Sequence, residues 1–345
     1  MSALRARAAD DFRAQGVPHR RVEAWKYSDL RSAVDIQQIT SAAAANWTIE
    51  SEGVEMIALS DGRFAGAMGQ ASLAFAHAGF GLRVAKAGKV HVKFGTPGQA
   101  RVRIVVEPGA TLDYFETAEG DAFQNIGMDV SVGAGAVFTH ARISRRAGGV
   151  RIEDVNATVA ENGAYRLHTA SFGSDLSRLE LIISLDGENA QAHLSGVSVL
   201  RDTHADVTTH IVHAKTGTQS TQLFKHVASG KGRAVYQGKI TVAKGADGSD
   251  SRQTAKALLL DVGAEADLKP ELEIFADDVK CAHGAAVGDL DAESLFYLRA
   301  RGIPEAEARA MLMRAFLEEA FDGVSSEETR TLLWQATNMA LEAVA

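Results

Sequence analysis

The single cysteine of this 345-residue chain, Cys281, stands two positions before His283 in the segment ADDVKCAHGAAVG, residues 276–288. In an extended strand the two side chains would point to the same side, about 7 Å apart or less. Thiolate and imidazole are ligands that suit iron or zinc. Two ligands do not complete a metal site, so further donors would have to come from elsewhere in the fold or from a second chain. From spacing alone, a buried structural cysteine beside a histidine is the simpler interpretation.

A cysteine beside a histidine can also act as a nucleophile, but such a thiol usually needs a helix N-terminus or a charged neighbour that lowers its pKa. The only such neighbour is Lys280, which would alternate to the other face of a strand. The chain also contains no G-x-x-x-x-G-K-[ST] loop, no G-x-S-x-G elbow and no H-E-x-x-H. We therefore expect a protein that is not an enzyme and does not hydrolyse ATP by itself.

Five other histidines crowd one third of the chain: His193, His204, His210, His213 and His226. On a strand, His210 and His213 would point to opposite faces, so they would not bind one metal without a bulge. His204 and His210 could share a face, but no carboxylate or thiol joins them at a suitable spacing. We expect these histidines to be polar residues on an outer wall.

The composition excludes several classes of protein. The formal charge is -8 and the basic residues are scattered, which argues against nucleic acid or an anionic membrane as a partner. No apolar run is long enough to span a membrane, and the N-terminus carries charge where a signal peptide would be apolar. One cysteine permits no intrachain disulfide. We expect a cytoplasmic protein.

The elements that would position Cys281 and His283 are strands. From about residue 82 to 275 apolar residues recur at every second position, as in RVRIVVEPG and LELIISLDG, and turn signals recur every 25–28 residues. This period without helical segments indicates a solenoid of stacked turns. Many inward positions hold Ala, Gly, Ser or Thr, which favours a β-helix over a thick two-sheet sandwich.

Both ends of the chain are predicted to be helical. The segment SALRARAADDFRAQ should form a helix that Gly16 ends, and Asp291 should cap the first of three C-terminal helices. Ser325 and Glu328 stand in capping-box spacing before the last one. We therefore expect an N-terminal helical region with lead-in strands over 1–81, a β-helix core over 82–288 and a C-terminal helical domain over 289–345.

Three longer motifs carry a resemblance to a known family. LEIFADDVKCAHGAAVGDLDAESLFYLRARGI resembles the C-terminal signature of the SufB/SufD family of iron-sulfur cluster assembly proteins, and PHRRVEAWKYSDLR resembles the opening motif of its SufD-type members. TQLFKHVASGKGRAVYQGKITVAKGADGSDSRQTAKALLL is similar to the family's late β-helix turns. The resemblance spans residues 18 to about 320, and it implies a right-handed parallel β-helix with helical parts at both ends.

The resemblance also implies partners. It describes a non-catalytic subunit that pairs with the SufB paralogue and, through residues of about 289–321, docks the SufC ATPase, whose ATP binding rearranges the complex and exposes an assembly site. The candidate docking residues are apolar: Leu295, Phe296, Leu298, Met311, Leu312 and Phe316. Helix packing on the β-helix would explain the same residues. A homodimer is possible for the isolated chain.

The family places the histidine of the C-x-H-G motif, here His283, at the SufB–SufD interface, where the nascent cluster is built opposite a SufB cysteine. Cys281 holds the neighbouring motif position. These residues are the candidate ligands of a transient iron-sulfur cluster shared with SufB, and we expect no cofactor that this chain holds stably alone. A single cysteine argues against a self-sufficient cluster scaffold, because a usual cluster takes four protein ligands.

Two other functions are compatible with a β-helix. A carbohydrate-active enzyme of the pectate-lyase type would need carboxylates, basic residues and exposed aromatics along one groove, and the low aromatic content of 6% argues against it. A structural β-helix could polymerise end to end, but helices that cover both ends would prevent this.

Overall fold

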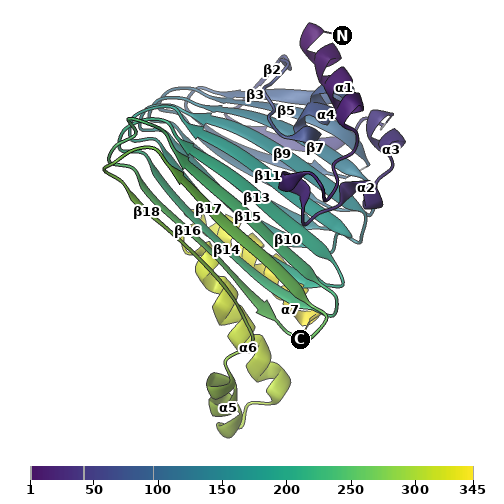
Figure 1. The fold of residues 1–345 in the computed structure, drawn as a ribbon, viewed down its shortest axis with the longest axis vertical. Coiled ribbons are helices and arrows are strands. Elements are labelled where there is room, and N and C mark those ends of the chain that lie inside the picture. Colours follow the sequence, from purple (N-terminus) through teal and green to yellow (C-terminus); the bar gives the residue numbers. More distant parts are fainter. Residues whose placement is uncertain (1, 42, 96, 345) are drawn as a thin grey trace.

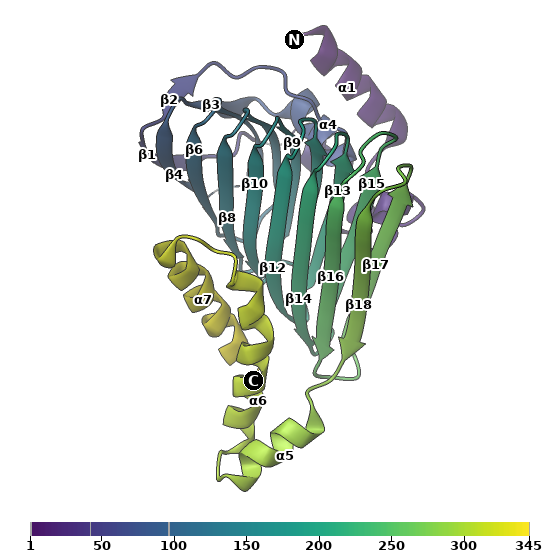
Figure 2. The same cartoon turned by 90° about the vertical axis from the view of Figure 1, so that its left-hand side faces the viewer.

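The computed structural model describes residues 2–41, 43–95 and 97–344, and within them two nine-stranded sheets face each other as the walls of a β-solenoid (Figures 1 and 2). Sheet A runs in the order β17-β15-β13-β11-β9-β7-β5-β3-β2, and sheet B in the order β1-β4-β6-β8-β10-β12-β14-β16-β18. Neighbouring strands are parallel, except that β1 and β2 pair antiparallel with β4 and β3. The expected parallel β-helix is confirmed.

The strands of sheet A are β2 Glu55–Ile57, β3 Ala78–Val84, β5 Gly98–Val106, β7 Gln124–Val132, β9 Val150–Val159, β11 Leu176–Leu185, β13 His204–His213, β15 Arg233–Val242 and β17 Glu265–Ile274. The strands of sheet B are β1 Trp47–Glu52, β4 Ala87–Phe94, β6 Thr111–Ala118, β8 Val137–Arg145, β10 Ala164–Phe172, β12 Gln191–Arg201, β14 Gln219–Ser229, β16 Asp250–Leu259 and β18 Lys280–Gly288. From β3 to β18, consecutive strands therefore alternate between the two sheets, and each pair makes one turn of the solenoid.

The space between the sheets, which we call the bore, is filled by the alternating apolar residues. Val102, Ile104 and Val106 on β5 are buried there, and they are in register with Met128, Val130 and Val132 on β7, which are also buried. Because parallel neighbours lie about 4.8 Å apart, each apolar side chain stacks on its equivalent in the next turn. The apolar residues at every second position of each strand thus form a continuous core along the solenoid axis.

The N-terminal helices cover the outer face of sheet A. They are α1 Ala3–Gln15, α2 Leu30–Ala33, α3 Ile36–Thr40 and α4 Ala67–Phe75, with a 3₁₀ helix, η1, at Glu23–Trp25. Phe12, Trp25, Leu30 and Met68 pack with Ile152 of β9 in a separate apolar cluster. The sequence pattern does not predict α4. Its one glycine, Gly69, lies close against sheet A, where a Cβ would be 2.5 Å from the carboxylate of Asp154 on β9.

The C-terminal helices begin after β18. They are α5 Ala292–Ala300, α6 Glu305–Glu318 and α7 Glu327–Glu342, with a 3₁₀ helix, η2, at Glu319–Phe321. Asp291 caps α5 as predicted, because its carboxylate accepts from the Ser294 backbone N–H. The expected Ser325–Glu328 capping box is wrong by one residue: Ser326 is the cap of α7 and accepts from Thr329. No helix in the described part of the chain is long and apolar enough to cross a membrane.

The helices cover the side walls of the solenoid and leave one end open. Helices α6 and α7 pack on the outer face of sheet B, whereas α5 projects below it (Figure 2). The last strands, β17 and β18, each have a neighbour on one side only, and β18 contains no buried residue. The expectation that helices cover both ends was therefore wrong, because their apolar faces pack on the outer surfaces of the sheets.

Candidate functional site

The open end carries the two candidate ligands. On β18, Cys281 is in register with Ser251 of β16, and His283 is in register with Gln253. Ser251 and Gln253 are buried in the bore, so Cys281 and His283 both stand in the inward-facing row of sheet B. Their predicted common face is confirmed. Cys281 is half-buried and His283 is exposed, because no further turn covers β18.

The surroundings of Cys281 do not activate its thiol. Burial and the charge of Asp250 raise the pKa of the Cys281 thiol, which keeps it protonated at neutral pH. A catalytic thiolate requires the opposite shift. The geometry agrees with the interpretation that this cysteine is not a nucleophile of a Cys-His dyad.

Hydrogen-bonded polar side chains continue into the bore from both residues, on the side of β18 away from the open end; we call this direction below. Below Cys281, the hydroxyl of Ser251 lies 2.8 Å from that of Ser220, which in turn lies 2.9 Å from Nε2 of His213. Below His283, Nε2 of Gln253 donates to the Tyr236 hydroxyl at 2.8 Å. Polar groups inside a solenoid are costly unless they are paired. These two columns therefore differ from the apolar inward rows of β5 and β7, at residues 102–106 and 128–132.

The prediction that the central histidines lie on an outer wall is wrong for two of them. His213 and His226 follow Ile211 and Phe224 at alternate positions, and both are fully buried in the bore. Burial lowers the pKa of each ring to about 4, so both are neutral at pH 7. His193, His204 and His210 occupy the outward-facing positions, and the opposite orientations of His210 and His213 are confirmed.

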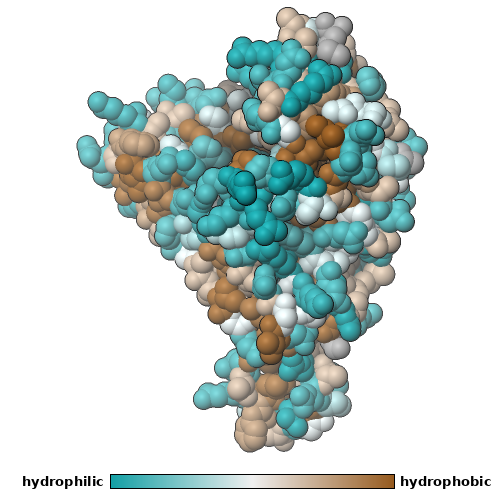
Figure 3. Space-filling view, turned by 45° about the vertical axis from the view of Figure 1, so that its right-hand side comes forward, coloured by the Kyte–Doolittle hydropathy of each residue, from teal (hydrophilic) through white to brown (hydrophobic). Residues whose placement is uncertain are grey.

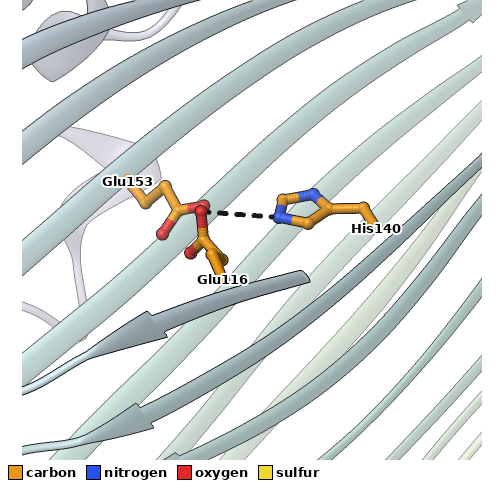
Figure 4. Close-up of side chains that lie close together, drawn as sticks. All are labelled: Glu116, His140 and Glu153. Atoms are coloured by element: carbon orange, nitrogen blue, oxygen red, sulfur yellow. Dashed lines mark ion pairs between the residues drawn. The ribbon is translucent and has the colours of Figure 1, made fainter. Parts of the chain in front are cut away.

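A second polar cluster lies deeper in the bore, where Glu116, His140 and Glu153 bring potential metal-ligand atoms within 4.8 Å of one another (Figure 4). Both carboxylates are already paired with guanidinium groups: Arg142 contacts Glu116 at 3.3 Å and Glu153 at 2.8 Å, and Arg151 contacts them at 3.0 and 2.8 Å. Two positive charges balance two negative ones, so a dication would add uncompensated buried charge. This cluster is a structural ion network, which the sequence pattern did not predict.

The candidate docking residues of the C-terminal helices fall into two groups. Phe296 on α5 and Met311 on α6 are exposed, at 73% and 40%, and apolar side chains reach the surface of the projecting part in Figure 3. Leu295, Leu298 and Leu312 are half-buried. Phe316 is also half-buried and packs toward sheet B, where the Lys225 ammonium lies 4.8 Å from the centre of its ring. The exposed apolar surface therefore centres on α5.

Comparison with known proteins agrees with this geometry. Residues 91–316 match the family model described as "SUF system FeS cluster assembly, SufBD core domain". The chain is 39% identical over 170 residues to the "Iron-sulfur cluster assembly protein SufD" of Escherichia coli, covering 49% of this chain and 40% of that protein. The region matched by the family model begins within β4, continues through β18 and includes most of α6, and it therefore contains both candidate ligands.

Two further relatives extend the match. An iron-sulfur cluster assembly SufBD family protein of Synechocystis is 30% identical over 66% of this chain and 53% of its own length. Protein ABCI7, chloroplastic, of Arabidopsis thaliana is 30% identical over 67% of this chain and 50% of its own length. The chain spans about half the length of these curated relatives. It belongs to the SufBD family of the SUF iron-sulfur cluster assembly system, as a protein of the SufD type.

Proposed function

We propose that this chain is a non-catalytic subunit of an iron-sulfur cluster assembly complex. It pairs with a SufB-type paralogue through the open end of its solenoid and docks a SufC-type ATPase on α5 and α6. ATP binding by that ATPase changes the geometry of the paired interface. His283, with Cys281 beside it, then contributes to a site at which the cluster is built and from which it leaves.

The observation that carries this proposal is the exposure of the candidate ligands on an edge strand, β18, which is paired on one side only. A sheet edge with free N–H and C=O groups is a template for a strand of another chain. Val287 of the same row is 49% exposed, and Ile274 and Phe275 at the end of β17 are 42% and 64% exposed. Apolar side chains around unpaired backbone suit a protein partner, which would supply the missing cluster ligands.

The carbohydrate-active alternative gains no support. A groove of about 700 Å³ lies over β4, β6 and β8 beside α7. Phe115 is its one phenyl ring, and it is half-buried against His91. A sugar-binding groove usually presents exposed aromatic faces, and the family match favours cluster assembly.

Two substitutions should separate the two partners. In anaerobic co-purification with the SufB- and SufC-type subunits, Val287→Asp is expected to lose the SufB-type subunit but keep the ATPase, because it places a charge on the open end. Phe296→Asp is expected to lose the ATPase but keep the SufB-type subunit. Each variant is the control for the other. Retention of both partners by both variants, with wild-type thermal stability, would exclude these surfaces as interfaces.

His283→Ala should assemble normally but build little cluster. The exposed ring makes no hydrogen bond to any described residue, so its removal is expected to leave the fold and both interfaces intact. We expect the purified complex to contain several-fold less iron and acid-labile sulfide than wild type. The matched control is His77→Ala, an exposed histidine directly before β3, at the other end of sheet A. Unchanged iron and sulfide in the His283 variant would remove this residue from the mechanism.

A further inference from the structure

The inward-facing row of sheet B places two glutamines below His283. Gln253 of β16 is the register neighbour of His283, and Gln222 of β14 is the register neighbour of Gln253. Gln253 is 1% exposed and Gln222 is 3% exposed. An aliphatic side chain at either position would continue the apolar bore, as Ala255 and Phe224 do two residues later. The two glutamines therefore form a buried polar row where apolar side chains would also fit, and the next residue of this row on the open side is His283.

Hydrogen bonds hold the Gln253 amide in one orientation. Its Nε2 donates to the Tyr236 hydroxyl at 2.8 Å, and that hydroxyl donates to Oε1 of Gln222 at 3.1 Å. Thr209 donates to the same Gln222 oxygen at 2.6 Å. The contact depends on Gly238 of β15, because a Cβ there would lie 1.7 Å from Nε2 of Gln253. One N–H of the Gln253 amide is thereby used in the hydrogen bond to Tyr236.

The carbonyl oxygen of Gln253 has no partner. Oε1 is buried and makes no hydrogen bond within the described residues. A buried acceptor without a donor is costly. The next strand on the open side is β18, about 4.8 Å away, and the side chain at the register position is the His283 ring. The other unpartnered amide group of the row, Nε2 of Gln222, belongs to β14, on the far side of Gln253.

We propose that Gln253 is a positioning residue for His283. The exposed His283 ring, which makes no hydrogen bond to a described residue in the structure, turns toward the bore so that Oε1 of Gln253 accepts its N–H. This bond fixes one tautomer and leaves the other ring nitrogen with a free lone pair. Metal-binding histidines commonly donate their second N–H to such an acceptor, and this partner sets the orientation and basicity of the ring. That the free nitrogen binds iron rests on the function proposed above, whereas the orientation of the ring does not.

The orientation is testable on the full chain without partners. In protein labelled with ¹⁵N-histidine, the His283 signals are assigned by their absence from His283→Gln, at an alkaline pH where histidine rings are neutral. Wild type is expected to give two well-separated ring ¹⁵N shifts, the signature of one tautomer. Gln253→Met keeps the volume but removes the acceptor, so the two shifts should move toward a common mean.

A matched control and a second variant keep the result interpretable. Gln237→Met replaces another buried glutamine, on the outward face of β15 in the opposite sheet, and should leave the His283 shifts unchanged. Tyr236→Phe leaves Gln253 in place but removes the hydroxyl that holds its amide, and should release the tautomer as Gln253→Met does. Unchanged His283 shifts in folded Gln253→Met or Tyr236→Phe protein would overturn the proposal.

Cluster loading distinguishes the positioning role from the proposed function. In the co-purified complex, Gln253→Met is expected to contain several-fold less iron and sulfide than Gln237→Met. If the tautomer is released and cluster loading is unchanged, Gln253 still positions the ring, and the proposed role of His283 as a ligand is wrong. If loading falls and the tautomer does not change, the positioning role is wrong.

Discussion

Replacing Arg142 by methionine is expected to lower the free energy of unfolding by about 3–5 kcal/mol, the usual cost of removing one partner from a buried ion pair. Arg142 is 2% exposed and contacts Glu116, Glu153 and the Thr169 hydroxyl. Without it, Arg151 is the one guanidinium group of the network left to pair with both carboxylates. One uncompensated negative charge then remains in the bore, far from water.

The state of Glu116 shows how strongly this network is coupled. Burial alone would raise the pKa of its carboxyl group, but the His140 ring and the charges of Arg151 and Arg142 outweigh burial and hold the pKa well below its usual range. The stability that this ionised carboxylate contributes is present above its unfolded pKa, and it is lost only as the pH falls toward the depressed folded value. The network should therefore keep its charges throughout the neutral range.

Chemical denaturation followed by circular dichroism measures the Arg142→Met effect, and two further variants control it. Arg83→Met removes an exposed arginine that pairs with Glu107 at 2.7 Å, and should cost about 0–1 kcal/mol. Arg142→Met combined with Glu116→Gln restores charge balance, so the double variant should be more stable than Arg142→Met alone. Equal losses for Arg142→Met and Arg83→Met would contradict a structural role for the network.

The solenoid could be predicted because the sequence pattern that specifies it lies within single strands and their turns. Alternation such as Leu179, Leu181 and Ile183 on one strand defines an inward face without knowledge of any other strand, and the turn spacing repeats that face. The same rule correctly placed Cys281 and His283 on one face. It does not say whether that face is inward or outward, which is why the buried positions of His213 and His226 were not predicted.

The parts that could not be predicted depend on pairing between turns. The ion network unites residues from β6, β8 and β9, and its charges balance only when the register brings Glu116 beside Arg142. The support below His283 likewise depends on Gln253, Tyr236 and Gln222 from three strands. The exposure of His283 depends on the end of the solenoid at β18. The change to a helical pattern after Gly288 predicts that end, but it does not say whether the C-terminal helices cover it.

The stability of the N-terminal helices on sheet A should fall as the pH rises from about 4 to about 8. Asp154 of β9 lies buried under α4, with its carboxylate accepting from the Gly69 backbone N–H at 3.1 Å and from the Asn156 amide at 2.6 Å. Burial, and then the negative charge of Glu180, raise its pKa to about 8.

The neighbouring guanidinium group of Arg178 does not offset the rise in the pKa of Asp154. Arg178 lies 2.5 Å from Asp206 and 3.1 Å from Glu180, and it also stacks on Trp25, with 4.1 Å between its guanidinium carbon and the ring centre. Three carboxyl groups on adjacent strands thus share one guanidinium group. The one most distant from it, Asp154, retains its proton.

Because the folded pKa of Asp154 is above its unfolded value of about 3.9, its contribution to stability is fully present below that value and is lost as the pH rises through about 8. The loss is at most about 1.4 kcal/mol per pH unit. Asp154→Asn keeps a neutral side chain at every pH, so the variant should be more stable than wild type near pH 8, by several kcal/mol, and should show a flatter pH profile.

Thermal unfolding between about pH 5 and about pH 9 tests this expectation, because the two profiles should converge at the acid end and diverge at the alkaline end. Asp113→Asn, at an exposed aspartate on the outer face of β6, controls for the loss of one carboxyl group. Parallel profiles for wild type and Asp154→Asn would mean that Asp154 is ionised in the folded chain. The attachment of α4 to sheet A would then have to depend on a charged hydrogen bond from Gly69, and the Asn variant should be less stable than wild type at pH 8.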